Sequence, residues 1–382
     1  MMPRNGQYET LPRDVYCDHA RVWHVTRYAD LRDALKTPDL GANFRSMLAR
    51  HPAFSYTTTS LLRGSPIFID GPLRMHIRHM VVTYMRHTLT DALRASAQDM
   101  VTDLVNQIEP DVETDAVQTL ADQLPARVMR YLTGLPGEIG QIICQHAATL
   151  GEGSTEAFPS TKRAKEIENS AQELTNYLGP QLAQRLKNPG DDLLSYLVLR
   201  RDTELLDDEG LLALAVFLLI AAQVTTASFL SAIVQTLAGA SQILPRLSVN
   251  PMLRRGFLNE VLRLETPLQI IVRRCLRDTS IGGVSVPADA GVMLHLGTGN
   301  RDPDEFEIPG LFLASRPNVL NHLAFGGGSR ACPGARLALF EGEAMAEALG
   351  KRFRRISADR SCQWKKGQVL KSITELPVIF HA

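Results

Sequence analysis

The residues of this chain with the strongest chemical signature are a cysteine and the glycines before it. The run FGGGSRACPG, from Phe325 to Gly334, comes directly before a helical pattern over residues 336–350. The free N–H groups and the positive dipole end of a helix N-terminus favour a thiolate. Glycines let the backbone turn sharply and approach a flat ligand, and N–H groups aimed at sulfur tune a metal-bound thiolate. Arg330 can pair with a carboxylate of that ligand. The pattern predicts a thiolate site at Cys332.

Two other interpretations of this loop remain open on local features. A glycine-rich turn before a helix can carry a cysteine that has no role. Cys332 could also be a nucleophile, which would need a histidine base, and His322 is the nearest histidine in the sequence. The chain has five cysteines, which are scattered and include no CxxC pair. This spacing argues against a zinc site and against a disulfide framework.

Three further groups of polar residues lie on predicted helices. Glu260 and Arg263 stand three residues apart on one face, a pair that usually contributes only about 0–1 kcal/mol at a surface. Arg74 and Arg78 stand one turn apart and can face one anion or form a solvated basic face. Residues 221–226 interrupt an apolar helix, where threonine hydroxyls either bond the preceding turn or line a local widening.

Together these segments resemble the cytochrome P-450 family. In the heme-binding signature of that family a Phe, a Gly, an Arg or His, a Cys and a second Gly stand at fixed spacing. These positions are filled here by Phe325, Gly328, Arg330, Cys332 and Gly334. The resemblance implies heme b as cofactor, with Cys332 as the iron ligand, Phe325 near the heme and Arg330 paired with a propionate.

The resemblance assigns roles to other residues outside the cysteine loop. The further side chains implied to contact the heme propionates are Arg74, Arg78 and Arg273. Arg74 stands where the family usually has histidine, and Arg274, beside Arg273, makes that assignment ambiguous. A buried ion network that holds the cysteine loop without doing chemistry is implied for Glu260, Arg263 and Arg316.

The chain departs from the family pattern in the oxygen-activating helix. Thr225 corresponds to the threonine beside the oxygen-binding position, but Ala222 stands where glycine is usual and Val224 where an acid is usual. Valine cannot relay a proton, and proton transfer from a positioned group is worth roughly 10²–10⁴-fold. Gln223 or water held by Thr225 could supply the proton, or the substrate could. A third option is modified chemistry such as oxidative coupling, desaturation or use of peroxide.

The implied substrate pocket is apolar and suits a small, natural-product-like molecule. Its expected walls are the loop near residues 54–62, which begins with Phe54, and the side chains of Phe217, Ala221, Ala222, Ile270, Ile271, Ile373 and Thr374. No flavin domain accompanies these motifs, so a ferredoxin and its reductase are expected to deliver electrons near Arg330 and Arg336.

To position these residues the chain needs a mainly helical fold with a minor β-sheet region. Helical patterns are expected at residues 30–36, 72–108, 115–132, 162–186, 191–200, 207–237, 250–264 and 336–350. Strands are expected at residues 23–26, in a hairpin over 279–296 and at 374–380, and residues 41–65 are expected to form a long loop. The resemblance implies one P-450 domain over residues 1–382, with heme between the long helix 207–237 and the helix after the cysteine loop.

Composition narrows the class of function. The 41 Lys and Arg balance the 41 Asp and Glu, which argues against a nucleic-acid binder. The longest apolar run, residues 211–222, is too short to span a membrane, and the first residues carry no signal core. The expectation is a soluble, cytoplasmic, monomeric heme-thiolate oxidoreductase. The alternatives are a P-450-like protein that binds heme and recruits a partner without oxygen turnover, and a cysteine hydrolase built on Cys332.

Overall fold

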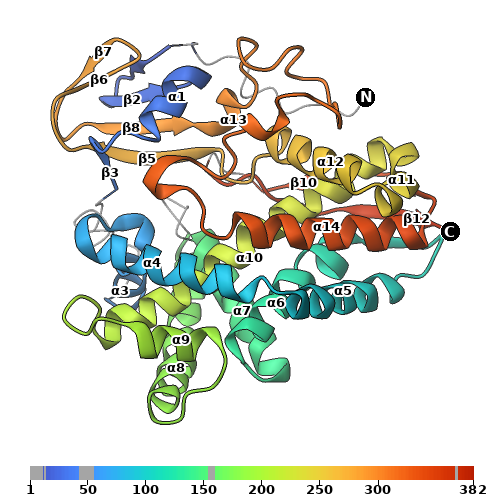
Figure 1. Cartoon of the computed structure of the whole chain (residues 1–382), viewed down its shortest axis with the longest axis horizontal. Coiled ribbons are helices and arrows are strands. Elements are labelled where there is room, and N and C mark those ends of the chain that lie inside the picture. Colours follow the sequence, from blue (N-terminus) through green and yellow to red (C-terminus); the bar gives the residue numbers. More distant parts are fainter. Residues whose placement is uncertain (1–11, 13, 43–55, 154–159, 366–368) are drawn as a thin grey trace. The chain divides into compact units, whose positions relative to one another are not determined.

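The computed structural model describes residues 12, 14–42, 56–153, 160–365 and 369–382 (Figure 1). Their contacts divide the chain into two compact units. Unit 1 comprises Met1–Gly41, Arg94–Leu124 and Thr225–Ala382, and unit 2 comprises Ala42–Leu93 and Pro125–Val224. Helix α10 (Asp208–Gly239) runs through the boundary between Val224 and Thr225.

Unit 2 is helical. Its helices are α3 (Tyr56–Arg63), α4 (Gly71–Thr88), the start of α5 (Asp91–Asn106), most of α6 (Gln123–Thr133), α7 (Gly137–Gly153), α8 (Thr161–Lys187), α9 (Leu193–Arg200) and the first half of α10, with a 3₁₀ turn at Pro66–Phe68. Side-chain caps fix two of the starts, because Ser160 accepts a hydrogen bond from the Arg163 N–H and Asp192 accepts one from the Ser195 N–H. Asp192 also pairs with Arg185 at 2.9 Å, which ties α9 to the end of α8.

All the described strands lie in unit 1. The largest sheet has the order β1-β2-β8-β5-β3. Its strands are β1 (Tyr16–Cys17), β2 (Val22–Val25), β8 (Gly291–His295), β5 (Ile270–Cys275) and β3 (Leu40–Gly41). In Figure 1 the blue strand β2 lies beside the orange strand β8, and the two run parallel although they come from opposite ends of the chain.

The core of this sheet is built from alternating side chains. Val25 of β2 and Val292 and Leu294 of β8 are fully buried, and Leu31 of α1 (Tyr28–Ala34) packs into the same cluster. Because successive side chains of a strand point to opposite faces, residues two apart share this core. The cluster fixes α1, the helix whose end contacts the glycine loop before Cys332.

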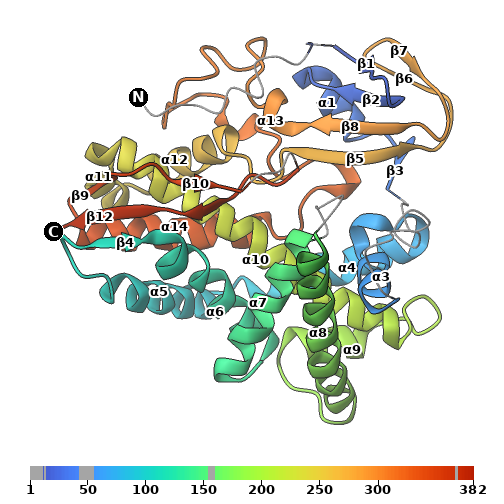
Figure 2. The same ribbon diagram turned by 180° about the vertical axis from the view of Figure 1, so that it is seen from behind.

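The remaining described elements of unit 1 are helices, turns and three small sheets. The helices are α11 (Leu244–Val249), α12 (Pro251–Leu264), α13 (Leu296–Gly299) and α14 (Ala335–Arg352), with 3₁₀ or π turns at Val117–Ala121, Ser241–Ile243, Val319–Asn321 and Gly328–Arg330. The small sheets pair β4 (Glu113–Asp115) and β9 (Arg355–Ser357) with β12 (Pro377–His381), β10 (Gln363–Trp364) with β11 (Ile373–Glu375), and β6 (Thr279–Ile281) with β7 (Val284–Val286). Figure 2 shows β4 beside β12.

The expectation of a mainly helical fold with a minor sheet is confirmed, with corrections to single elements. The predicted loop over residues 41–65 contains α3, the single final strand is two strands, and α7 and β5 were not predicted. Helix α10 is long and apolar enough to cross a membrane, yet 56% of its most apolar window is buried within the protein, as in a core helix. Phe54 lies outside the described residues.

Candidate functional site

The cysteine loop is a tight turn held by its own backbone. The Cys332 N–H donates to the Phe325 carbonyl at 2.9 Å, which closes the loop at the start of α14. Gly326 and Gly328 have φ of 67° and 61°, the left-handed region that favours glycine. A Cβ at Gly328 would stand 2.5 Å from the Leu35 carbonyl oxygen at the end of α1. The loop conformation and its contact with α1 therefore require glycine at position 328.

Cys332 differs from the buried cysteines in its surroundings. Its side chain is exposed, whereas Cys144 and Cys275 are buried. Burial raises the pKa of the Cys144 thiol to about 12 and also raises that of Cys275, so both stay protonated thiols that suit core packing. The geometry of Cys332, accessible at a helix N-terminus, is the one that a metal-binding thiolate needs.

His322 is not placed to act as a base for Cys332. Its Nδ1 accepts the Ala324 N–H at 3.2 Å, so the proton sits on Nε2, which donates to Asn259 Oδ1 at 3.0 Å. Burial, with Arg263 nearby, lowers the pKa of His322 to about 4. Both ring nitrogens are occupied by structural hydrogen bonds, so the one histidine proposed for a nucleophilic mechanism does not support it.

The structure brings Glu260, Arg263 and Arg316 together in a buried network. Arg263 forms two hydrogen bonds of 2.8 Å with the Glu260 carboxylate, and Arg316 Nε lies 3.0 Å from Oε1. All three side chains are buried. Burial alone would raise the pKa of Glu260, but hydrogen bonds from Arg263, the Leu313 N–H and Arg316 hold it below its usual value.

That network ties α12 to the coil before the cysteine loop. Arg263 Nη1 donates to the carbonyls of Asn300 and Pro309, each at 2.8 Å, and Arg316 Nη1 donates to the Glu307 carbonyl at 2.7 Å. A charge-assisted network of this kind fixes the coil without leaving the carboxylate unpaired. The structure therefore brings the three predicted residues together, and their predicted role in holding the cysteine loop stays a prediction.

Strand β5 distinguishes between the two neighbouring arginines. Arg274 pairs with Asp289 at 2.6 Å on an exposed face. Arg273 lies on the opposite face of the strand, the same face as Ile271, because alternate residues share a face. Ile271 Cδ1 is 3.9 Å from where a Cβ at Gly326 would stand. Of the two arginines, Arg273 therefore shares its strand face with the residue that contacts the cysteine loop.

Comparison with known proteins decides which family has this arrangement. Residues 251–371 match the family model for cytochrome P-450. The mycinamicin IV hydroxylase/epoxidase of Micromonospora griseorubida is 30% identical over 94% of this chain and 89% of that protein. The erythromycin C-12 hydroxylase of Saccharopolyspora erythraea is 30% identical over 96% of this chain and 91% of that protein.

The chain belongs to the cytochrome P-450 family. The fold agrees: the solved structure of the P-450 BioI in complex with an acyl carrier protein ligated to hexadec-9Z-enoic acid has a TM-score of 0.89 at 24% identity, covering 98% of this chain and 97% of that one. P-450 proteins bind heme b, act on small molecules and receive electrons from redox partners, so this chain is a P-450 monooxygenase with heme b as cofactor.

The residues of the cysteine loop fit that cofactor. The Cys332 thiol is exposed just before α14, and it follows Gly326 and Gly328, whose left-handed backbone shapes the loop without side chains. When bound, a heme held by thiolate supplies the activation of dioxygen. What the structure shows of this chain's contribution is the exposed Cys332 thiol and the close approach of Gly328 to Leu35, which fixes the loop against the end of α1.

Unit 2 of this P-450 carries some of the residues predicted for the heme and the pocket. Arg74 and Arg78 are half-buried on α4, one turn apart as expected. On α10, Gln223 is 5% exposed, whereas Phe217, Ala221 and Ala222 are half-buried. Their predicted contacts with heme and substrate stay predictions.

Val224 has a packing role in unit 2. A Cβ at Gly151 of α7 would stand 3.2 Å from Val224 Cγ2 and 2.4 Å from Ile220 Cγ2. This apolar contact explains why an aliphatic side chain suits position 224. With valine at position 224, the chain also lacks the acid that the family usually carries there.

The predicted pocket residues of unit 1 do not share one surface. Ile270 and Ile373 are buried and Ile271 is half-buried. Thr374 is exposed, and its hydroxyl donates to the Gln363 carbonyl at 3.4 Å, on the opposite face of β11 from Ile373. Thr374 therefore does not line the same surface as Ile373, because adjacent strand residues point apart.

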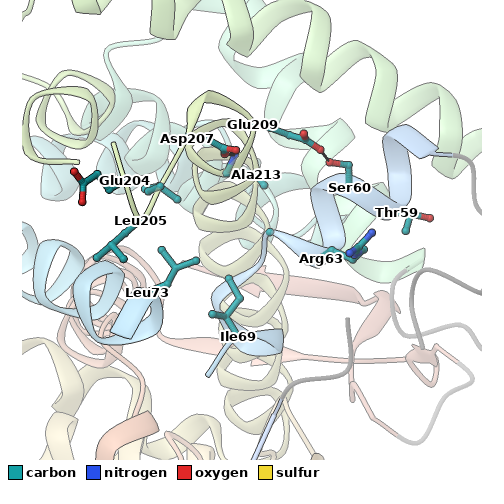
Figure 3. Close-up of a pocket in the computed structure, with 13 residues that line it drawn as sticks. Thr59, Ser60, Arg63, Ile69, Leu73, Glu204, Leu205, Asp207, Glu209 and Ala213 are labelled. Carbon is teal, nitrogen blue, oxygen red and sulfur yellow. Dashed lines mark hydrogen bonds between the residues drawn. The ribbon is translucent and has the colours of Figure 1, made fainter. Parts of the chain in front are cut away.

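A separate cavity of 440 Å³ lies within unit 2 (Figure 3). Figure 3 shows Ile69, Leu73 and Leu205 converging on it beneath a rim where the Ser60 hydroxyl bonds Glu209. Ser60 belongs to the wall expected from residues 54–62, but Phe217, Ala221 and Ala222 do not line this cavity. It is therefore distinct from the predicted substrate pocket.

Sequence reasoning missed the residues that support the site from a distance. Leu35 contacts the glycine loop through its backbone, and Asn259 fixes His322. Backbone contacts leave no side-chain signal.

Proposed function

We propose that this P-450 holds its heme iron through Cys332, with Arg330, Arg273, Arg74 and Arg78 pairing the propionates and Phe325 and Gly334 shaping the loop. The observation that carries the proposal is the exposed thiol at the N-terminus of α14, after two left-handed glycines. We further propose that residues 1–382 act as one P-450 domain, cytoplasmic and monomeric, with heme between α10 and α14.

A carbon monoxide difference spectrum of the reduced protein tests this assignment. The wild type and a Cys362→Ser control should both give the long-wavelength band of thiolate-bound heme, because Cys362 lies on the coil before β10. Cys332→Ser should lose that band, since the hydroxyl is a much weaker anionic ligand. Retention of the band in Cys332→Ser would overturn the proposal.

We propose that the substrate is apolar or amphipathic and of natural-product size. The mycinamicin and erythromycin hydroxylases act on molecules of that kind by name, and the expected pocket side chains are mainly apolar. Binding spectra with a panel of such molecules, and of small charged metabolites as controls, test this. A response to charged metabolites alone would contradict it.

Electrons are proposed to come from a ferredoxin and its reductase, docking near Arg330 and Arg336. Charge-assisted docking weakens as salt shortens the Debye length. The rate of heme reduction by ferredoxin should therefore fall between low and high salt, while reduction by dithionite, which needs no docking, serves as the control. If the rate at which ferredoxin reduces the heme is the same at low and high salt, docking near Arg330 and Arg336 is contradicted.

The second candidate is a P-450-like protein that binds heme and recruits a partner without turning over oxygen. Val224 is the observation that favours it, because the usual acid is replaced by a packing residue. NADPH consumption together with product formation would support the monooxygenase. A heme-loaded protein that binds ligands but forms no product with reductase or with peroxide would support the second candidate.

A further inference from the structure

His322 connects helix α12 to the start of the cysteine loop. Its Nε2 donates to Asn259 Oδ1 on α12 at 3.0 Å, and its Nδ1 accepts the Ala324 N–H at 3.2 Å. Asn259 is 3% exposed, and its Nδ2 donates to the Arg255 carbonyl at 2.8 Å, which fixes the amide with its oxygen toward the ring. A neutral imidazole has one donor and one acceptor nitrogen, and this geometry uses both.

The hydrogen bond to Ala324 reaches Cys332 through one further residue. The residue after Ala324 is Phe325, whose carbonyl accepts the Cys332 N–H at 2.9 Å. The rings of His322 and Phe325 also contact each other, with their centroids 5.7 Å apart. His322 therefore holds the backbone N–H just before Phe325 as well as the Phe325 ring. A shift of either would move the carbonyl that orients the Cys332 N–H.

The surroundings of His322 keep its acceptor nitrogen available. Burial, with the Arg263 guanidinium nearby, lowers the pKa of this ring to about 4. A protonated ring would carry a proton on Nδ1 and could not accept the Ala324 N–H. At neutral pH the ring is therefore in the form that the loop needs.

A second link holds the neighbouring backbone amide. The Leu323 N–H donates to Asn300 Oδ1 at 2.6 Å, and Asn300 Nδ2 donates to the Thr266 hydroxyl at 2.6 Å, just past the end of α12. Asn300 is fully buried. Because this link ties the coil to α12 without His322, removal of the imidazole should loosen the loop while the protein stays folded.

We propose that His322 is a positioning residue that sets the backbone from which the Cys332 sulfur is presented to the iron. It acts through Ala324 and Phe325 and is itself held by Asn259. The inference rests on the proposed function, in which Cys332 is the iron ligand. Residues that orient a metal ligand from behind tune how firmly that ligand is held. The ion network does not fill this role, because its hydrogen bonds reach the coil over residues 300–313, before the loop.

The first test follows the loop amides and needs no turnover. His322→Phe keeps a ring beside Phe325 but loses both hydrogen bonds. Hydrogen exchange over residues 323–332 of the heme-loaded protein should therefore be about tenfold faster than in wild type. The oxygen of His322→Asn stands as many bonds from the backbone as Nδ1 does and can accept the Ala324 N–H, so this variant should recover much of the protection. Exchange in His322→Phe at the wild-type rate would overturn the proposal.

The second test measures how firmly the sulfur stays on the iron. The reduced carbon monoxide complex of His322→Phe should lose its long-wavelength band about tenfold faster than wild type, and His322→Asn should recover much of that lifetime. His295→Phe is the matched control, because it removes another buried imidazole, which bonds His24 at 2.8 Å on strand β8. It should keep the wild-type lifetime even where it lowers the melting midpoint as much as His322→Phe does.

The link through Asn259 is tested by a double-mutant cycle on the same lifetime. Asn259→Ala should shorten the lifetime, because the ring of His322 loses the partner that holds it. Combining it with His322→Phe should add little, since the two residues act through one hydrogen bond. Effects that multiply independently would contradict the role of Asn259.

The failure of this inference and that of the proposed function give different results. If Cys332→Ser keeps the long-wavelength band, the proposed function fails and His322 has no sulfur to position. If the band depends on Cys332 but His295→Phe shortens its lifetime as much as His322→Phe does, the effect reflects general stability. The positioning role is then wrong, while Cys332 remains the iron ligand.

Discussion

At the scale of single residues, the site depends on one carboxylate shared by two guanidinium groups. Glu260 is fully buried and accepts hydrogen bonds from Arg263, Arg316 and the Leu313 N–H. Removing one partner of a buried network leaves the opposite charges without compensation. We therefore expect the network to be more sensitive to substitution than the exposed ion pairs of the described residues, such as Arg274 with Asp289.

We predict that Glu260→Gln lowers the free energy of unfolding by about 3–5 kcal/mol, because two buried guanidinium groups lose their counter-charge. Denaturant unfolding measures this. Asp289→Asn is the matched control, since the Arg274–Asp289 pair is exposed and should change stability by about 0–1 kcal/mol. Equal effects of the two substitutions would mean that the network does not support the fold.

The residue scale also shows what the sequence could reveal about the site. The spacing of Phe325, Gly328, Arg330 and Cys332 was enough to locate the cysteine loop, because such motifs are local. The choice between Arg273 and Arg274 was not local, and it needed the strand β5 that assigns alternate side chains to opposite faces. The burial of Glu341 depends on the packing of α14 on α10, which no local pattern encodes.

At the scale of elements, some helices contain glycine where a neighbouring helix packs too closely to leave room for a side chain. Those glycines also make the helices hard to predict from the sequence. Helix α7 contains four glycines, which lower helix propensity and hid it from periodicity. Gly151 is needed because a Cβ there would lie 2.4 Å from Ile220 Cγ2 of α10. Helix α3 lies within the predicted loop of residues 41–65, and its three β-branched threonines lower its helix propensity. In both cases tertiary packing outweighs local propensity.

The same reasoning gives a prediction for α12, the helix that carries Glu260 and Arg263. A Cβ at Gly256 would stand 2.1 Å from the Ala314 carbonyl oxygen, in the coil that also holds Arg316. Gly256→Ala should force α12 and this coil apart and cost about 1–3 kcal/mol of unfolding free energy. Denaturant unfolding and heme retention measure the effect.

Gly239→Ala, at the end of α10, is the control for that substitution. A Cβ there would meet nothing within 4 Å, so stability should be unchanged or rise by up to about 1 kcal/mol through helix propensity. If Gly256→Ala is as stable as Gly239→Ala, the contact between α12 and the coil is not a tight one.

At the scale of the whole molecule, three buried groups with opposite preferences shape the dependence of stability on pH. Burial, with His24 nearby, lowers the pKa of His295 to about 4, and burial with Arg263 does the same for His322. Burial raises the pKa of Glu341 to about 8. The two histidines reduce stability as pH falls from about 6.5 to about 4, and the glutamate reduces it as pH rises from about 4.5 to about 8. We therefore expect the optimum between about pH 4.5 and about pH 6.5, where both losses are partial.

The acid side of that optimum yields a measurable prediction. The pKa of a histidine in the unfolded chain is about 6.5, whereas His295 and His322 have a pKa of about 4 in the folded protein. Their contribution to stability is therefore fully present above about pH 6.5 and is lost as the pH falls toward 4. Each contributes up to about 3 kcal/mol to that loss. His322→Gln should flatten the slope of unfolding free energy against pH by up to one proton, measured by denaturant unfolding at a series of pH values. His19→Gln, at an exposed position, should leave the slope as it is. A slope that His322→Gln does not change would mean that this ring takes up its proton in the folded protein as readily as in the unfolded chain.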